Sequence, residues 1–393
     1  MTDDDRPATA GWEQPPRPGV RRWRAAAATV AAVVVGVGVL LVPRDPPARL
    51  SVGPTTAPAD AALTDPVDPR DFVPERLAPI ETTTERPGTG QLLPGGPADL
   101  TIVAADDRGL YLLETDTGDL RRIAVRRPTP ASLSETLFVV GDDIVVDADT
   151  DVVVLPRTSV RPTRIAAGHR AVPTVDDRSV WVFDNITRFV TGTASRIGLD
   201  GAVHTQIQLP AVAEPLAGTA DGLMVGTPGA VTLVTADGQR RLVARGMAVA
   251  TDGRRLAWLQ CADDLSCVIN IGTVDDPEQV RTALDPTVLP AGFFGLPTGT
   301  FSPDGRWLAL PLYESSRGLE DVTVSVIDTT TGTEAYRAKG SARMPFNTPL
   351  AWSPDSRWLI FVSESDLRAW RAGQQQATTI DADVRGIRAL AVR

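Results

Sequence analysis

Three alternating aspartates are the clearest candidate for a bound metal ion. Asp147, Asp149 and Asp151 form a D-x-D-x-D run, and carboxylate oxygens are ligands that calcium prefers. The calcium loop of an EF-hand would continue with a glycine and later a glutamate, but Val152 and Thr158 occupy those two positions. The run also follows directly on β-branched residues, so a solvated turn and strand face explains the aspartates more simply. Calcium is the weaker interpretation.

Side chains for nucleophilic catalysis or zinc binding are scarce. The chain has two histidines, His169 and His204, and no G-x-S-x-G turn that would present a nucleophilic serine. Its two cysteines, Cys261 and Cys267, are too few for a zinc site built of thiolates. Apart from the calcium candidate we therefore assign no metal site, no catalytic residue and no cofactor.

Cys261 and Cys267 are predicted to form a disulfide bond. They flank a short polar stretch between two strand-like runs, 256–260 and 268–271, and cysteines that face each other across a hairpin lie within bonding reach. Such a bond persists in an exported domain, whereas two free thiols are the alternative in a reducing compartment. The loop is short, so the bond would stabilise one hairpin rather than the whole fold.

One phrase that occurs twice near the C-terminus predicts the scaffold for these residues. It reads as a strand end, a tight turn and a new strand, in residues 301–310 and again in residues 352–361. Proline presets φ in the turn, and the Asp-Gly or Asp-Ser pair tolerates unusual backbone angles. The copies are about 50 residues apart, near the length of one propeller blade. The turn residues of these copies and of a third, less complete one are Ser302, Pro303, Asp304 and Gly305; Ser353, Pro354 and Asp355; and Asp252 and Gly253.

The same pattern extends backwards through the chain. From residue 98 onward, short alternating or β-branched runs are broken by Asp/Gly turns, which is typical of an all-β fold. Weaker copies of the first turn occur at 140–144, 175–181 and 219–223. A second turn, expected between the third and fourth strands of a unit, occurs at 116–118, 200–201, 237–238 and 330–332. The expected units are 98–126, 134–168, 171–210, 213–245, 246–285, 297–340 and 348–380.

We therefore predict a β-propeller of seven blades, and the weak units leave six or eight compatible with the sequence. The first unit is one strand short, and residues 387–392 read as a strand without a partner. Because an open ring would expose unpaired strand edges, we expect this last strand to complete the first blade. Six tryptophans fall on strand positions, where packing between blades is favoured over a sugar-binding surface. They are Trp181, Trp258, Trp307, Trp352, Trp358 and Trp370.

The Ser-Pro-Asp-Gly turns resemble those of TolB-like and WD-repeat-like bacterial β-propellers. The resemblance covers roughly residues 98–393 and rests on three turns, and it implies binding of a protein or an envelope polymer. The chain departs from TolB in having no separate α/β domain ahead of the propeller. Ser302, Asp304 and Trp307 also resemble part of the sialidase Asp-box, but their spacing differs from it, and turn and blade packing explains them better.

The first 97 residues differ from the rest in composition. Residues 1–24 are polar and end in several arginines, which predicts a disordered cytoplasmic tail. Residues 25–42 are apolar and uncharged, long enough for one membrane-spanning helix, and the arginines before them place the N-terminus in the cytoplasm. A cleaved signal peptide is the competing interpretation, although the nearest small-residue site, 57–59, lies far downstream.

Residues 43–97 are rich in Pro, Thr and Gly, which predicts an extended extracytoplasmic linker ahead of a propeller domain at 98–393. The end of the linker carries apolar residues that could dock on the domain, namely Phe72, Val73, Leu77 and Ile80. The formal net charge of −10 argues against binding nucleic acid.

The sequence thus predicts a membrane-anchored, single-pass protein of the bacterial cell envelope, with its propeller outside the cell membrane. We expect that propeller to bind a protein or an envelope polymer without enzymatic activity. The alternative is an exported propeller hydrolase or lyase with a carboxylate site at the central channel.

Overall fold

Antiparallel sheets make up the regular structure of the described part of the chain. The computed structural model describes residues 72–393 apart from short gaps, of which the longest are 124–136, 184–191, 285–292, 315–321 and 341–348. The predicted tail and membrane span, 1–42, lie outside the described residues. Among the residues that are described, no helix is long and apolar enough to cross a membrane.

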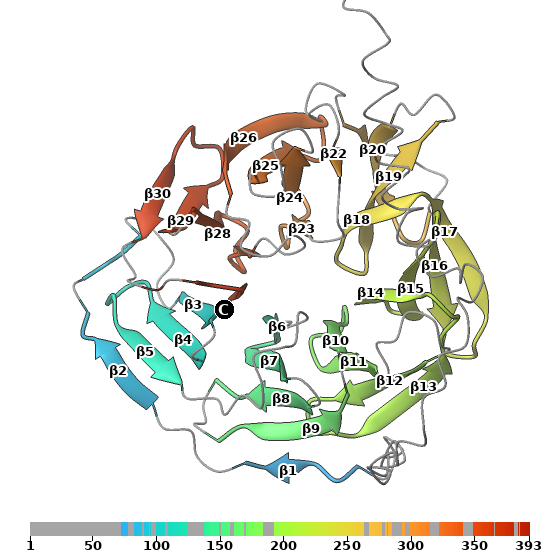
Figure 1. The fold of residues 1–393 in the computed structure, drawn as a ribbon, viewed down its shortest axis with the longest axis horizontal. Coiled ribbons are helices and arrows are strands. Elements are labelled where there is room, and N and C mark those ends of the chain that lie inside the picture. Colours follow the sequence, from blue (N-terminus) through green and yellow to red (C-terminus); the bar gives the residue numbers. More distant parts are fainter. Residues whose placement is uncertain are drawn as a thin grey trace, which may run out of the picture. The chain divides into compact units, whose positions relative to one another are not determined.

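Seven sheets follow one another round a ring, and each is one blade of a β-propeller (Figure 1). Blades 1 to 3 contain, in order, β3 (Thr101–Asp106), β4 (Gly109–Glu114) and β5 (Leu120–Ile123); β6 (Leu137–Val140), β7 (Asp143–Ala148), β8 (Asp151–Leu155) and β9 (Thr163–Ala167); and β10 (Arg170–Pro173), β11 (Ser179–Phe183), β12 (Thr193–Gly198) and β13 (Val203–Gln208).

Blades 4 and 5 contain β14 (Glu214–Gly218), β15 (Gly222–Thr227), β16 (Ala230–Thr235) and β17 (Arg240–Arg245); and β18 (Met247–Thr251), β19 (Arg255–Cys261), β20 (Cys267–Thr273) and β21 (Thr282–Ala283). Blades 6 and 7 contain β22 (Phe293–Phe294), β23 (Thr300–Phe301), β24 (Trp307–Glu314), β25 (Val322–Asp328) and β26 (Thr333–Lys339); and β27 (Leu350–Trp352), β28 (Trp358–Ser363), β29 (Asp366–Arg371) and β30 (Ala377–Ile380). The prediction of a seven-bladed, all-β propeller is confirmed.

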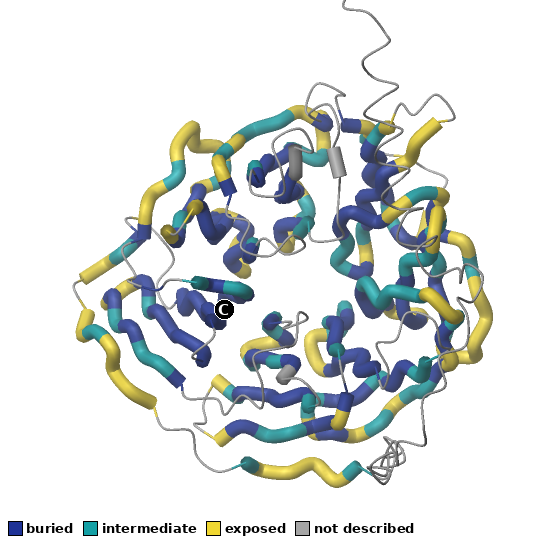
Figure 2. Tube along the Cα trace, viewed as in Figure 1, coloured by how far each residue is buried: buried dark blue, intermediate teal, exposed yellow. Residues whose placement is uncertain are grey.

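The apolar core is divided into seven clusters, one between each pair of neighbouring blades (Figure 2). Strand β11 contributes side chains to two of these clusters, because successive side chains of a strand point to opposite faces of its sheet. Val180 and Val182 pack towards blade 2, while Trp181 and Phe183 pack towards blade 4. A central strand is therefore apolar at every position, and its sequence does not alternate.

The ring is closed by the C-terminus, as the sequence predicts. Strand β31 (Ala389–Val392) pairs antiparallel with β3, with Ala391 opposite Val103, and becomes the innermost strand of blade 1. It contacts β6 of blade 2 and β27 of blade 7. Blade 1 thus joins the two ends of the propeller sequence in one sheet.

The order of strands gives the ring two different faces. In a four-stranded antiparallel blade, the first-to-second and third-to-fourth turns lie at one end, and the remaining connections lie at the other. We call these the turn face and the connection face. All six first turns and all four second turns expected from the sequence join the strands that were expected for them.

Two further strands come from residues that the sequence assigned to the linker. Strand β1 (Glu75–Arg76) pairs with the outer edge of β9, and β2 (Thr82–Arg86) pairs with the outer edge of β5, so blades 2 and 1 each gain a fifth, outermost strand (Figure 1). We call the described residues from 72 to 93 the N-terminal belt. It runs round the rim from blade 3 to blade 1 and ends with Leu93 buried between blades 1 and 7.

Candidate binding surfaces of the ring

The turn face is built from a repeated hydrogen-bonded turn. In blade 6 the Ser302 hydroxyl donates to Asp304 at 2.6 Å, and the Trp307 backbone N–H donates to Ser302 Oγ at 2.9 Å. In blade 7 Ser353 makes the corresponding bonds, to Asp355 at 2.5 Å and from Trp358 at 2.9 Å. The serine and aspartate of the phrase therefore satisfy the backbone of their own turn and leave little polar capacity for a ligand.

The two turns, residues 302–307 and 353–358, differ at one position, and the neighbouring blade explains why. Gly305 has φ +76°, and a Cβ there would lie 1.2 Å from the guanidinium of Arg255, which donates to the Pro303 carbonyl at 2.9 Å. Ser356 has φ +62°, and its hydroxyl accepts a bond from the Asp304 N–H at 2.9 Å. The missing side chain at Gly305 leaves room for Arg255 of blade 5, and the Ser356 side chain of blade 7 bonds to the turn of blade 6. Both residues thus allow a contact between turns of neighbouring blades.

Similar links continue round the turn face. Arg254 donates to the Val175 carbonyl at 3.3 Å, and Arg393 donates to the Asp142 carbonyl at 3.5 Å. Contacts between turns thus connect blades that are far apart in the sequence. Polar groups of the turn face therefore bond to neighbouring turns and stabilise the ring.

Asp176 shows how fully a turn carboxylate is used. Burial by itself raises its pKa, but hydrogen bonds from Thr174, Arg196, the Arg178 N–H and Ser179 outweigh burial and lower the pKa well below its ordinary value. The pKa of Asp237, on the turn of blade 4, is also lowered, by bonds from Thr235 and Gln239. A general acid would need a raised pKa, so neither carboxyl group fits that role.

The connection face has a different character. Four of its links between strands have nine or more residues, and they join strand ends at 124–136, 184–192, 284–292 and 340–349. At the inner ends of blades 3 and 4 on this face, Arg170 pairs with Glu214 at 3.3 Å. Val212 lies in the link between these blades with φ +65° and 40% of its surface exposed. A β-branched residue in this conformation is strained, and such strain clusters at binding sites.

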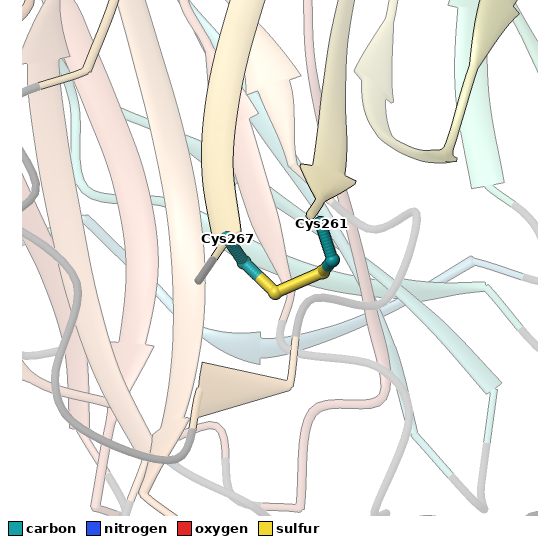
Figure 3. Close-up of a disulfide and its surroundings, with 2 residues drawn as sticks. All are labelled: Cys261 and Cys267. Carbon is teal, nitrogen blue, oxygen red and sulfur yellow. A yellow bond between two sulfur atoms is a disulfide. The ribbon is translucent and has the colours of Figure 1, made fainter. Parts of the chain in front are cut away.

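The predicted disulfide also lies on the connection face and is confirmed. Cys261 and Cys267 are directly opposite each other on β19 and β20, and their Cα atoms are 4.0 Å apart (Figure 3). The bond ties together the two central strands of blade 5 where they leave the core.

The aspartates of the calcium hypothesis are not gathered at one point by the sheet register. Ala148 is opposite Asp151 across the β7–β8 hairpin, so Asp147 and Asp151 point to opposite faces of the sheet. Asp147 is buried, and the Asp151 carboxylate is 3.4 Å from Arg164. Asp149 lies outside the described residues. Among those that are described, no group of three or more His, Cys, Asp or Glu side chains could hold a metal ion.

The rim is a third surface, formed by the outermost strands, and the sequence did not draw attention to it. Where the belt covers the rim, arginines on the fourth strand meet glutamates on the fifth: Arg122 is 3.4 Å from Glu85, and Arg164 is 3.3 Å from Glu75. Arg164 also lies 5.1 Å from the ring of Phe72. The run of three β-branched threonines, 82–84, was the signal for a strand there.

Comparison with known proteins supports the fold. No protein-family model matches the chain, and no curated protein sequence matches it. A functionally unknown protein from Desulfotomaculum acetoxidans DSM 771 has a TM-score of 0.50 at 14% identity, covering 75% of this chain and 98% of that one. The β-propeller domain of the Trilobed protease from Pyrococcus furiosus has a TM-score of 0.50 at 12% identity, covering 77% of this chain and 97% of that one. An oligogalacturonate lyase in complex with manganese has a TM-score of 0.49 at 13% identity, covering 74% and 94%.

At these identities the two likenesses with a TM-score of 0.50 show the β-propeller fold alone. The Trilobed protease propeller is described as having an open velcro topology, whereas β31 of the present chain pairs with β3. The closer resemblance to TolB-like and WD-repeat-like propellers stays a prediction.

Proposed function

We propose that this chain is a membrane-anchored, extracytoplasmic β-propeller that binds a protein or an envelope polymer without catalysing a reaction. The observation that carries the proposal is the difference between the two faces of the ring. Turn-face polar groups are used in turns and in links between blades, whereas the connection face carries the longest links between blade strands and a strained, exposed valine. Variable connections held by a rigid scaffold are the usual place for binding residues.

The proposed location rests on two features of the chain. Residues 25–42 form an apolar run with arginines before it, and the disulfide between Cys261 and Cys267 would persist in an oxidising compartment. Alkylation of intact cells, followed by reduction and a second label, would report the state of both thiols. We expect them to be oxidised, and added protease should remove the propeller from unbroken cells. Free thiols in the cell would contradict the proposed location.

The binding role is tested by capture from envelope extracts with the purified full chain in detergent. Val212→Asn removes the exposed apolar side chain and places there a residue that accepts positive φ more readily, so the variant should be about 1 kcal/mol more stable and should bind less. Arg357→Ala on the turn face, where Arg357 is 69% exposed, is the matched control and should retain binding. Failure to capture any protein or polymer with the folded, oxidised chain would overturn the proposal.

A further inference from the structure

Four of the blades end in a fourth strand that carries arginine: β5, β9, β17 and β26. The belt covers two of them. On β5, Arg122 meets Glu85 of β2, and on β9, Arg164 meets Glu75 of β1. In both cases an extended segment that carries a glutamate has added itself to an edge that carries arginine. The molecule therefore shows the same mode of recognition twice: a strand adds to the edge of a blade, and its glutamate pairs with an arginine of the edge strand.

Strand β17 of blade 4 has the same basic character and no fifth strand. It carries Arg240, Arg241 and Arg245, and the sheet order ends with it. Within the part of the chain that the structure describes, no carboxylate forms an ion pair with any of the three, and Arg241 donates instead to the Val274 carbonyl at 3.2 Å. Between the arginines, Leu242 is 48% exposed.

The backbone of β17 is ready for a further strand. Gln239 accepts a bond from the Thr235 N–H, and the Gly246 N–H donates to Gly229, so both ends of β17 bond inwards to the ends of β16. In an antiparallel ladder, the backbone groups of successive residues point alternately towards the neighbouring strand and away from it. The bulge opposite Val231 and Thr232 adds one residue to β17 and shifts this alternation. The backbone N–H and C=O groups of Arg240, Leu242 and Arg245 therefore point away from β16. An outer strand could bond to these groups.

The other uncovered edges in the described part of the chain lack this combination. Strands β13 and β30 contain neither arginine nor a carboxylate, and β21 has two residues. On β26 the basic groups already have partners, because Arg337 is 2.6 Å from Glu334 and Lys339 is 3.8 Å from Glu364. Among the described edges, only β17 joins an open ladder to arginines that have no ion-pair partner in the described residues.

We propose that β17 is a docking edge for an extended, acidic segment of a partner protein, which adds to blade 4 as a fifth strand. The inference rests on the proposed binding function and names a surface and a ligand chemistry for it. Carboxylates of the incoming strand would face Arg240 and Arg245, and an apolar or small residue would cover Leu242. Arginine on an edge also discourages self-association, so the test must separate docking from mere protection.

The probe is a fluorescent peptide that copies residues 79–88, the β2 segment with its flanks, with Arg86→Thr to remove its positive charge. A control peptide has Glu81→Lys and Glu85→Lys. Anisotropy titrations with the full chain in detergent should show saturable binding of the acidic peptide. The lysine peptide should bind at least about tenfold more weakly, because like charges then oppose each other across the ladder.

Two variants place the peptide on β17. Leu242→Pro removes an outward N–H and leaves the inward ladder intact, so the propeller should fold as before while peptide binding is lost. Gln206→Pro on β13 is the matched control, since alternation from the Leu209–Gly192 bond also turns Gln206 outwards, and it should leave binding unchanged. Arg240→Gln with Arg245→Gln should weaken binding about tenfold. Circular dichroism and thermal unfolding verify that each variant folds.

Binding that survives Leu242→Pro, or absence of binding to the wild-type chain, would overturn the proposal and leave β17 as a protected edge. Binding that emerges only after Asp60, Asp65, Asp68 and Asp71 are replaced by Asn would overturn it too, because the edge would then belong to the chain's own acidic segment. The outcome is separate from that of the capture experiment. A partner captured by the connection face while the peptide fails would leave the proposed function standing without this edge.

Discussion

Blade 1 and blade 4 are both antiparallel sheets of the ring, but their strands come from different parts of the sequence. Blade 4 forms from one continuous stretch of chain, from β14 to β17, and its rim is bare. Blade 1 takes β31 on its inner side and β2 on its outer side, so its five strands come from three separate parts of the sequence. The comparison teaches that the ring has one seam, where both ends of the propeller sequence meet, and that the rim of blade 4 lacks the fifth strand that covers blades 1 and 2.

Loss of the closing strand should have the largest effect. Ending the chain after Ile387 removes Leu390 and Val392, both buried, and leaves β3, β6 and β27 without their neighbour. Burial of two such side chains is worth about 5 kcal/mol, comparable with the net stability of a domain. We expect aggregation or a failure to fold, measured by yield and by size-exclusion chromatography. A truncated chain that melted like the full chain would show that the seam does not hold the ring.

A leucine-to-alanine substitution should lower the free energy of unfolding much more in the belt than on the bare rim of blade 4. Leu93→Ala in the belt empties a site that is 1% exposed between blades 1 and 7, and should lower the free energy of unfolding by about 2–4 kcal/mol. Leu242→Ala on the bare rim, at a residue 48% exposed, should change it by less than about 0.5 kcal/mol. Denaturant titrations of both variants measure the difference. Equal costs would mean that the belt is not part of the core.

Alanine substitutions at two glycines, one beside the belt and one away from it, measure the contribution of the contact between the belt and the rim. Gly201 of blade 3 has φ +85°, and a Cβ there would lie 2.1 Å from Pro74. Gly238 of blade 4 has φ +82° and nothing within 4 Å. Alanine at either site costs about 1 kcal/mol for the backbone alone, so Gly201→Ala should cost more than Gly238→Ala by the amount needed to displace Pro74. Thermal unfolding of both variants gives that difference, and identical melting shifts would argue against the belt contact.

The ion pairs at the covered rim should contribute least. Glu75→Gln and Glu85→Gln each break one pair with an arginine, and because these side chains are partly exposed, each should cost less than about 1 kcal/mol. The effect should shrink at high salt. Unfolding at low and high ionic strength measures it, with Arg240→Gln on the bare rim as the control that should show no stability change. A salt-independent loss in the glutamate variants would point to packing rather than charge.

Much of the propeller could be predicted because its turns are local. Ser302, Asp304 and Trp307 bond within a few residues of one another, so the phrase carries its own structure wherever it occurs. The disulfide was equally accessible, since Cys261 and Cys267 border a single hairpin. The closing strand followed from the cost of an open edge.

The belt was harder to foresee, because its pairing joins residues far apart in the chain. Strand β2 places Thr82 opposite Ile123, and nothing near Thr82 indicates that partner. The apolar residues singled out at the end of the linker behave differently from one another. Phe72 lies against Arg164, the Leu77 N–H donates to the Pro162 carbonyl, and Val73 is 78% exposed. Ile80 lies outside the described residues.

The sequence alone thus determined the strand and turn repeat and the disulfide, because each depends on backbone preferences and hydrogen bonds within one hairpin, and it favoured seven blades. Only the tertiary structure decided where the repeats touch. It placed Arg255 against Gly305 and the Ser356 hydroxyl against the next turn, and it covered two basic edges while leaving β17 bare. Those outcomes depend on which blades become neighbours in the closed ring, and no local pattern of residues contains that information.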